Sequence, residues 1–214
     1  MGKKIAGQPT IRRLPSYLKI IQQAHDEGQF FISGTIIAGE LELEPIQVRK
    51  DLSITGIVGK PRIGYPTGEL LKAIRRFLHW DITRRAAVVG AGHLGQAIIG
   101  NPEFARHGLD IRAAFDTDPR KIGTRVKGVE VLSMERLEEK TRELALELAV
   151  LTVPSAAAQE TAEAVAAAGI RGIWNFTNVK LKLPDSVSVQ QENLASGYAV
   201  LSVRMGYHRP RGRS

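Results

Sequence analysis

The chain contains no cysteine, and this absence excludes several classes of site. Its 214 residues can form no disulfide, no Cys-ligated zinc site, no iron–sulfur cluster and no thiol nucleophile. It also lacks any apolar run near the roughly 20 residues that span a bilayer, and no apolar stretch follows its charged start. We therefore predict neither a membrane anchor nor a secretory signal, and we expect a cytoplasmic protein.

Basic residues are concentrated at the two ends of the chain. Residues 1–85 carry 14 basic and eight acidic residues, and residues 204–214 carry four arginines and no acid, within a net charge of +8. A basic module beside a near-neutral remainder indicates a polyanion partner such as nucleic acid. The alternative is a solvated basic surface without a partner.

The first third of the chain has the pattern of a helical DNA-binding module. Apolar residues at helical spacing predict a helix over 12–28, with Pro15 in its first turn. Ser33 is suited to cap a short second helix. A tight turn over 42–44 follows, and Pro45 opens a third helix. Two short helices joined by a tight turn predict a helix-turn-helix.

The third helix carries side chains that suit DNA. Arg49 can bind guanine bidentately, Gln47 can bind adenine, and Lys50 can neutralise phosphate. The alternative is an ordinary helical hairpin with a basic face.

A glycine-containing stretch after this helix predicts a wing. Residues 54–65 alternate glycine and apolar residues, which predicts a small β-hairpin with Lys60 and Arg62 at its tip. A further helix is expected over 68–80, and residues 81–85 form the expected linker. The residues predicted to contact DNA are Ser33, Gln47, Arg49, Lys50, Lys60, Arg62 and Tyr65.

Strand and helix patterns alternate in the remainder, which predicts a parallel sheet with helices on both faces. Apolar strands are expected over 86–89, 111–116, 144–153 and 171–176, and an alanine-rich helix over 155–169. The first strand runs into Gly90, Gly92 and Gly95, spaced as G-x-G-x-x-G, and a helix follows. This order of elements is the one that the dinucleotide-binding motif requires.

Each glycine in this motif has a physical role. The first permits a tight turn, the second lets the backbone approach a pyrophosphate, and the third allows close helix–strand packing. Asp116, 21 residues after Gly95, is placed to bind ribose hydroxyls, which favours NAD over NADP. The residues predicted to bind NAD are Gly90, Ala91, Gly92, His93, Leu94, Gly95, Asp116, Asp118, Val153 and Pro154.

The sequence offers no group for catalysis and no metal site. About 60 residues follow Pro154, too few for a substrate domain, and the five histidines show no metal-ligand spacing. A nucleotide site without visible chemistry beside a DNA-binding module predicts a nucleotide-gated regulator. The alternative is a small NAD-dependent oxidoreductase with a basic N-terminal extension.

Eight segments together resemble the Rex family of redox-sensing transcriptional repressors, over nearly the whole chain. They are IRRLPSYL, QVRKDLS, GKPRIGYPTGELLKAI, VVGAGHLGQAI, FDTDPRKIG, LTVPSAAAQ, GIRGIWNFT and ENLASGYAVLSV. The resemblance implies a homodimer whose C-terminal helix swaps onto the partner chain. It also implies that NADH releases the repressor from double-stranded operator DNA, whereas NAD⁺ permits binding.

These patterns together predict an α/β protein with three parts. They are a winged-helix DNA-binding domain over 1–81, a Rossmann-type NAD(H)-binding domain over 82–192, and a dimerisation helix with a basic tail over 193–214. Where many relatives have a tyrosine and an aspartate, this chain has Asn101 and Asn193. From that difference we expect a smaller contrast between NADH and NAD⁺ than relatives show.

Overall fold

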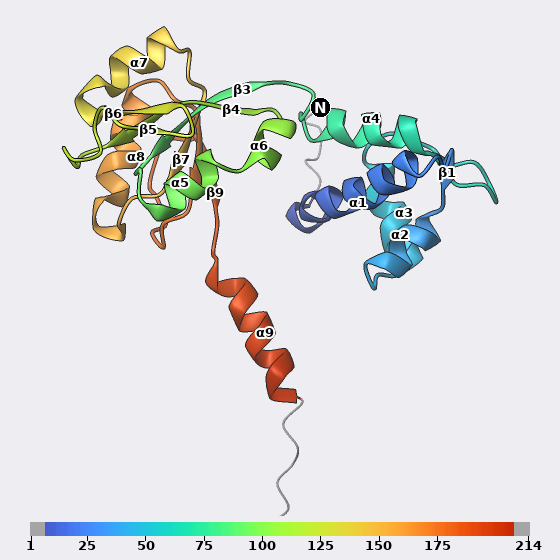
Figure 1. The fold of residues 1–214 in the computed structure, drawn as a ribbon. Coiled ribbons are helices and arrows are strands. Elements are labelled where there is room, and N and C mark those ends of the chain that lie inside the picture. Colours follow the sequence, from blue (N-terminus) through green and yellow to red (C-terminus); the bar gives the residue numbers. More distant parts are fainter. Residues whose placement is uncertain (1–6, 208–214) are drawn as a thin grey trace, which may run out of the picture. The chain divides into compact units, whose positions relative to one another are not determined.

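A computed structural model describes residues 7–207, and the chain divides into two compact units, Met1–Ile82 and Thr83–Ser214 (Figure 1). The first unit is helical with one short pair of strands. Its elements are α1 (Gln8–Asp26), β1 (Phe31–Ile32), α2 (Gly34–Glu40), α3 (Pro45–Ser53), β2 (Tyr65–Pro66) and α4 (Thr67–Phe77). One core cluster joins α1 to α4 through residues such as Leu14, Ile21, Val48 and Ile74. The predicted helix-turn-helix is formed by α2 and α3.

The first helix starts earlier than its pattern predicted. It begins at Gln8, so Pro9 occupies the first turn and Pro15 lies inside the helix. The predicted start at residue 12 and the predicted place of Pro15 are therefore wrong. A proline inside a helix removes one backbone hydrogen bond. The helix continues through it because Leu14 and Leu18, on either side, are buried in the core that α1 shares with α4.

The predicted β-hairpin of the wing is confirmed at its tip only. One antiparallel bridge joins Lys60 to Gly64 and encloses a turn over 61–63, so Arg62 lies within the turn and Lys60 at its base. The strand that follows, β2, pairs instead with β1, with Ile32 opposite Tyr65. A longer hairpin ladder would set Val58 opposite Pro66, which has no N–H to donate, and Tyr65 and Pro66 pair with the distant β1 instead.

The second unit contains a seven-stranded sheet in the order β5-β6-β4-β3-β7-β8-β9. The strands are β3 (Arg84–Val89), β4 (Leu109–Asp116), β5 (Arg125–Val126), β6 (Val129–Ser133), β7 (Leu148–Leu151), β8 (Gly172–Asn175) and β9 (Ser188–Gln191). All neighbours pair in parallel except β5 with β6. The six parallel strands thus run third-second-first-fourth-fifth-sixth, the order of dinucleotide-binding folds.

Helices cover both faces of this sheet (Figure 1). They are α5 (His93–Ile99), α6 (Pro102–Arg106), α7 (Leu137–Glu143) and α8 (Ala158–Ala167), with short 3-10 turns η1 (Met134–Arg136) and η2 (Ser155–Ala157). Alternate residues of β3 enter different cores because strand side chains alternate between faces. Val89 packs with Leu137 and Val165, whereas Val88 packs with Ile98.

The last described element is α9 (Ala195–Tyr207), within the segment predicted to form a helix. Residues 193–206 are exposed, including the apolar Leu194, Tyr198 and Leu201. The arginines predicted in the basic tail at positions 209, 211 and 213 lie outside the described residues. Across residues 7–207, no helix is long and apolar enough to cross a membrane.

Candidate functional site

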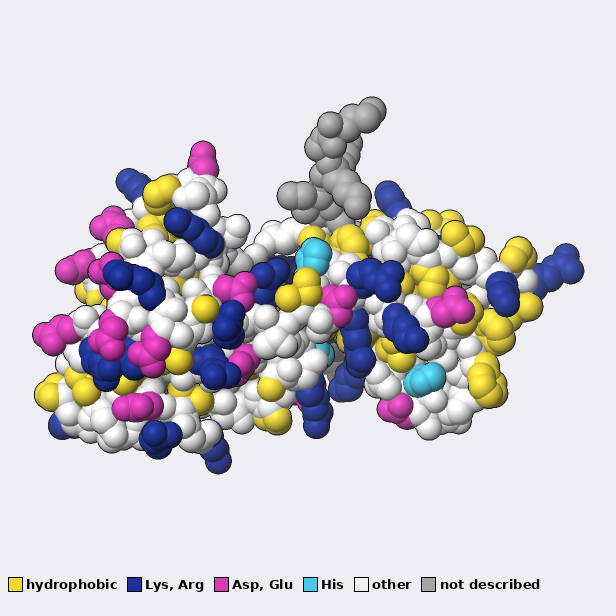
Figure 2. Space-filling view, turned by 90° about the horizontal axis from the view of Figure 1, so that it is seen from above, with side chains coloured by type: hydrophobic (Ala, Val, Ile, Leu, Met, Phe, Trp, Pro, Cys, Tyr) yellow, Lys and Arg dark blue, Asp and Glu magenta, His cyan; other side chains and the backbone are white. Residues whose placement is uncertain are grey.

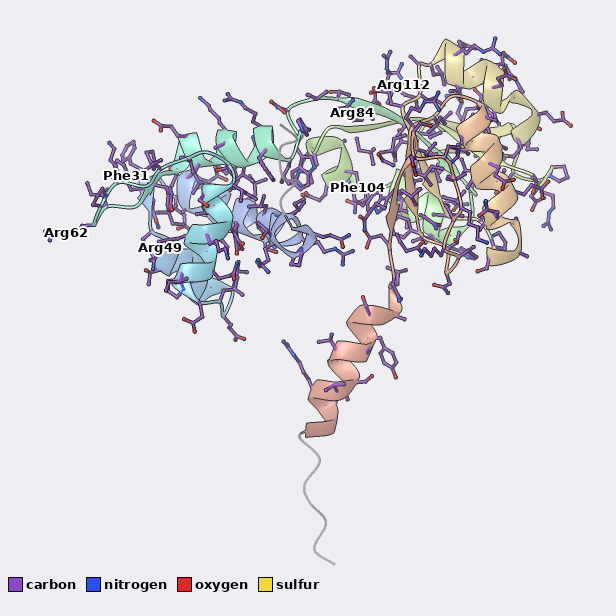
Figure 3. All side chains as sticks on the ribbon, turned by 180° about the vertical axis from the view of Figure 1, so that it is seen from behind. Phe31, Arg49, Arg62, Arg84, Phe104 and Arg112 are labelled. Atoms are coloured by element: carbon purple, nitrogen blue, oxygen red, sulfur yellow. The ribbon has the colours of Figure 1, made fainter. Side chains whose placement is uncertain are left out.

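The third helix has one buried and one exposed face. Val48, Asp51 and Leu52 are buried, whereas Arg49 and Lys50 are exposed. Figure 3 labels Arg49 on this helix. The helix therefore presents two of its predicted DNA-binding cations to solvent.

A buried carboxylate anchors α3 to α1. Asp51 is 1% exposed, and it accepts hydrogen bonds from the Nε and Nη2 of Arg13 at 2.7 and 3.0 Å. It also accepts from the Tyr17 hydroxyl at 2.6 Å, the Thr10 hydroxyl at 3.0 Å and the Gln47 amide at 2.8 Å. Gln47, predicted to read a base, thus points its amide nitrogen into this cluster.

These contacts fix the charge of Asp51. Burial raises the pKa of the carboxyl, but hydrogen bonds from Arg13, Tyr17, Gln47 and Thr10 outweigh it and lower the pKa to about 2. Burial, together with the bond to Asp51, raises the pKa of Tyr17. The carboxylate is therefore ionised and the phenol neutral at physiological pH, so the cluster is fully hydrogen-bonded.

The wing adds cations at a second place on the same unit. Arg62 lies at the turn of the loop with φ +63°, and Figure 3 labels it at the end of the loop. The Lys60 ammonium lies 5.3 Å from the centre of the Phe31 ring, within cation–π range. In Figure 2 few acidic side chains appear over this unit, whereas many appear over the unit that contains the sheet.

Two other predicted DNA contacts have structural roles. The hydroxyl of Ser33 caps α2 by accepting from the Ile36 N–H at 3.2 Å. Tyr65 is only 9% exposed and belongs to the core, so burial argues against a contact between its ring and DNA. A Cβ added at Gly59 would lie 3.0 Å from that ring, so Tyr65 supports the wing.

The glycine loop follows β3 and has the geometry that its motif requires. Gly90 has φ +102°, which favours glycine. A Cβ at Gly95 would lie 2.1 Å from the Gly90 carbonyl oxygen, so this helix–strand contact admits no side chain. A Cβ at Gly92 would meet no protein atom within 4 Å. The second glycine thus borders open space, where a pyrophosphate can approach the backbone.

Asp116 ends β4 beside this loop. Its carboxylate accepts from the Ala91 N–H at 2.8 Å, the Asp118 N–H at 2.9 Å and the Lys121 ammonium at 2.9 Å. Burial opposes ionisation, but these donors outweigh it, Lys121 most strongly, and lower the pKa of Asp116. The predicted ribose acceptor is thus a carboxylate held next to the glycine loop, with a lysine beside it.

The remaining predicted nucleotide contacts lie around the same strand ends. His93 and Leu94 are exposed in the first turn of α5. Val153 and Pro154 follow β7, which pairs with β3 at the point where the strand order reverses. Asp118 is bonded to the guanidinium of Arg120 at 2.8 Å.

Two residues at this site were missed by sequence reasoning. Thr152 donates from its hydroxyl to the Gly90 carbonyl at 2.7 Å and fixes the loop to β7. Lys121 was missed because the turn over 118–121 that brings its ammonium to Asp116 is seen only in the fold. Neither belongs to the glycine motif, so only the fold reveals them.

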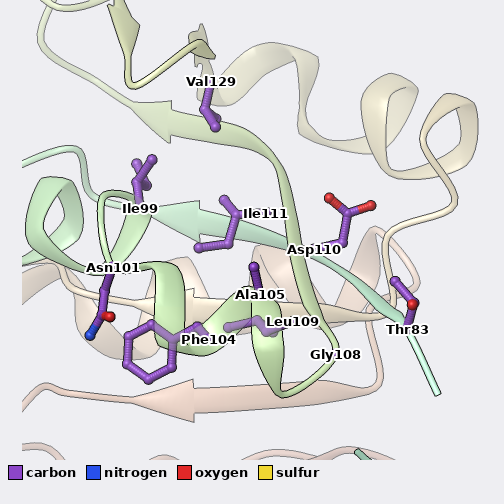
Figure 4. A pocket seen from close by; sticks show the side chains of 10 residues that line it. All are labelled: Thr83, Ile99, Asn101, Phe104, Ala105, Gly108, Leu109, Asp110, Ile111 and Val129. Carbon is purple, nitrogen blue, oxygen red and sulfur yellow. The ribbon is translucent and has the colours of Figure 1, made fainter. Parts of the chain in front are cut away.

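A separate cavity of about 370 Å³ lies at the other end of the sheet. It is lined mostly by apolar side chains around α6, among them Ile99, Phe104 and Ile111 (Figure 4). Asn101 also lines it and caps α6 by accepting from the Glu103 N–H at 3.0 Å. Because the strands β3 and β4 begin here, this cavity is distinct from the crevice at their carboxyl ends. Among residues 7–207, no group of three or more His, Asp or Glu side chains could hold a metal ion.

Two family models match parts of the chain. One, described as "CoA binding domain", matches residues 81–179, and another, "Putative DNA-binding protein N-terminus", matches residues 4–53.

Curated relatives match almost the whole chain. A "Redox-sensing transcriptional repressor Rex" of Treponema denticola is 55% identical over 203 residues, which are 95% of this chain and 97% of the relative. Proteins of the same name from Bacteroides fragilis and Lactobacillus gasseri are 33% and 38% identical. These two alignments cover 94% and 87% of this chain, and 91% and 87% of the relatives.

Solved structures agree with the sequence relatives. A crystal structure of RSP with β-NAD⁺ and operator DNA has a TM-score of 0.88 and 31% identity, and the match covers 96% of this chain and 94% of that one. RSP, a Rex-family repressor, has also been solved with β-NADH, with a TM-score of 0.86, 30% identity and 96% coverage of both chains.

Proposed function

The chain belongs to the Rex family of redox-sensing transcriptional repressors, and we propose that it binds double-stranded operator DNA and releases it when NADH binds. The observation that carries this proposal is the joining of two modules in one chain. A helix-turn-helix with exposed cations precedes a sheet with the strand order and glycine loop of a dinucleotide-binding fold. RSP, a Rex-family repressor of similar fold, has been solved with NAD⁺ and operator DNA and, in a separate structure, with NADH.

The DNA contacts follow from exposure and charge. Arg49 lies on the exposed face of α3 and is assigned to a base, because its guanidinium can bind guanine bidentately. Lys50, Lys60 and Arg62 are also exposed, and they are assigned to phosphates, where cations act without regard to sequence.

The nucleotide contacts follow from the crevice at the end of β3. Gly92 leaves room for the pyrophosphate, and Asp116 faces the place of the adenosine ribose, where its carboxylate accepts from hydroxyls. When bound, NADH or NAD⁺ supplies a nicotinamide ring that differs in charge between the two redox states. The fit of the loop supports binding of the nucleotide as a regulatory ligand.

The exposed apolar helix α9 supports a homodimer. Its apolar side chains are poorly suited to solvent, and packing on the partner chain would bury them. A dimer matches two half-sites of an operator. A repressor of operator DNA acts in the cytoplasm of a bacterium, where we place this protein.

The alternative function, a small oxidoreductase, needs a proton donor near the nicotinamide. Around the glycine loop, Asp116 is held by three donors, and no hydrogen bond from the exposed His93 to a carboxylate is found among the described residues. We infer that the nucleotide regulates and is not turned over. Sustained NADH oxidation with any carbonyl in a substrate panel would favour the oxidoreductase.

The direct test is selection of binding sites from a random duplex library, with NAD⁺ or NADH present. The proposal predicts enrichment of one palindromic site in NAD⁺ and its loss in NADH. Failure to enrich any site in either condition would contradict it.

A further inference from the structure

The exposed face of α3 carries more than cations. Ile46, Arg49, Lys50 and Ser53 are all exposed, and their spacing of three, four and seven residues places them on one side of the helix. Ile46 is 73% exposed although it is large and apolar. It lies in the first turn of α3, next to the turn of the helix-turn-helix.

Gln47 does not belong to this face. Its amide nitrogen donates to Asp51 at 2.8 Å, and Asp51 is buried and bound to Arg13 and Tyr17 of α1. This anchor fixes the rotation of α3 about its axis. The side chain free to meet a base in the first turn is therefore that of Ile46.

We propose that Ile46 determines sequence specificity by packing against the C5-methyl group of a thymine in the major groove, and that Gln47 takes no part in base reading. This inference rests on the proposed function and names a residue that the sequence patterns did not assign.

The chemistry of the groove favours this contact. The thymine methyl is the apolar group that base pairs present in the major groove, and residues at the start of a recognition helix are the ones that reach base edges. Arg49 and Lys50 make the same face cationic, which suits a polyanion better than an apolar protein partner. Because Ile46 and Arg49 are three residues apart, with Cβ atoms roughly 5–6 Å apart, the thymine should lie within about two base pairs of the Arg49 base.

The test removes the methyl group from the DNA and the side chain from the protein in turn. In the operator selected by the wild-type protein, each thymine is replaced singly by deoxyuridine, which keeps its base pairing. We expect one thymine per half-site at which this change weakens wild-type binding about fourfold. Ile46→Ala should weaken binding to the unmodified operator by a similar factor and should be insensitive to deoxyuridine there.

Three further variants separate this role from a general loss of binding. Arg49→Ala, profiled against single base-pair changes, identifies the neighbouring base. Gln47→Ala should keep the wild-type preference at every position, and a lost adenine preference would overturn its exclusion. Ile46→Val serves as the test if Ile46→Ala is unstable. Its thermal unfolding should match that of the wild type, and it should retain part of the deoxyuridine effect.

The outcomes are distinguishable. If an operator is selected, but every thymine-to-deoxyuridine change weakens binding equally in the wild type and in Ile46→Ala, this inference is overturned. The proposed function would then remain intact. Selection of no duplex at all overturns both.

Discussion

Each unit of this protein holds one nearly buried aspartate beside the surface assigned to its ligand, and the two differ in their partners. Asp51, in the DNA-binding unit, is 1% exposed and accepts only from side chains. Asp116, in the nucleotide unit, is 9% exposed and accepts from two backbone N–H groups and one lysine.

The difference separates an anchor from the carboxylate that we propose to bind ribose. The donors around Asp51 come from α1 and α3, so the carboxylate joins two helices and has no access to a ligand. The backbone donors around Asp116 only hold it beside the glycine loop. Lys121, whose side chain is half-buried, supplies its third bond. Asp51 is thus enclosed by side chains, whereas Asp116 borders the loop where we propose that the ribose binds.

The largest expected effect comes from removing the anchor. Asp51→Ala leaves the Arg13 guanidinium and the buried Tyr17 hydroxyl without their acceptor, and we expect it to destabilise the DNA-binding unit by about 3 kcal/mol. NADH affinity should not change, because Asp51 lies in the other unit. Thermal unfolding and NADH titration measure the two effects, and a loss of both would contradict the separation of roles.

A smaller effect is expected from acid. The pKa of Asp51 is about 2 in the fold, below its ordinary 3.8. The ionised group therefore stabilises the fold at all pH values above its unfolded pKa, and this contribution is lost as the pH falls from about 4 to about 2. The loss should be about 2 kcal/mol. Acid titration of Asp51→Asn, followed by circular dichroism, should lack this component. Equal acid sensitivity in both proteins would show that other carboxyls govern it.

The smallest free-energy change is expected in nucleotide binding, from removal of the proposed ribose acceptor. Asp116→Ala deletes the proposed ribose acceptor, and we expect NADH to bind about tenfold more weakly, equivalent to about 1.4 kcal/mol. Discrimination against NADPH should fall as well, because the carboxylate would repel a 2′-phosphate. Calorimetric titration with both nucleotides measures this, with Asp110→Ala, at the opposite end of β4, as the control. Unchanged NADH affinity in Asp116→Ala would place the ribose elsewhere.

Local signals in the sequence predicted much of the fold and the glycine loop. The cap at Ser33, the helix start at Pro45 and the turn at Gly90 each depend on residues a few positions apart. The pairing of β1 with β2 was missed because the strands have two residues each and lie more than 30 residues apart.

Contacts across the fold account for the other differences. Gln47 has the side chain of a base reader, and only the approach of α1 to α3 reveals its bond to Asp51. The edge strands β5 and β9, and β6 next to β5, lack the continuous apolar runs that mark β3 and β7, so their sequences gave no clear strand signal.

The central claim is that NADH releases this protein from DNA, and one measurement tests it most directly. Fluorescence anisotropy of the selected operator, at one fixed salt concentration, gives the affinity of the protein in NADH and in NAD⁺. We predict about fivefold or more weaker binding in NADH, and no response in Gly92→Val, whose side chain blocks the pyrophosphate. Equal operator affinity of the wild-type protein in NADH and NAD⁺ would contradict the account.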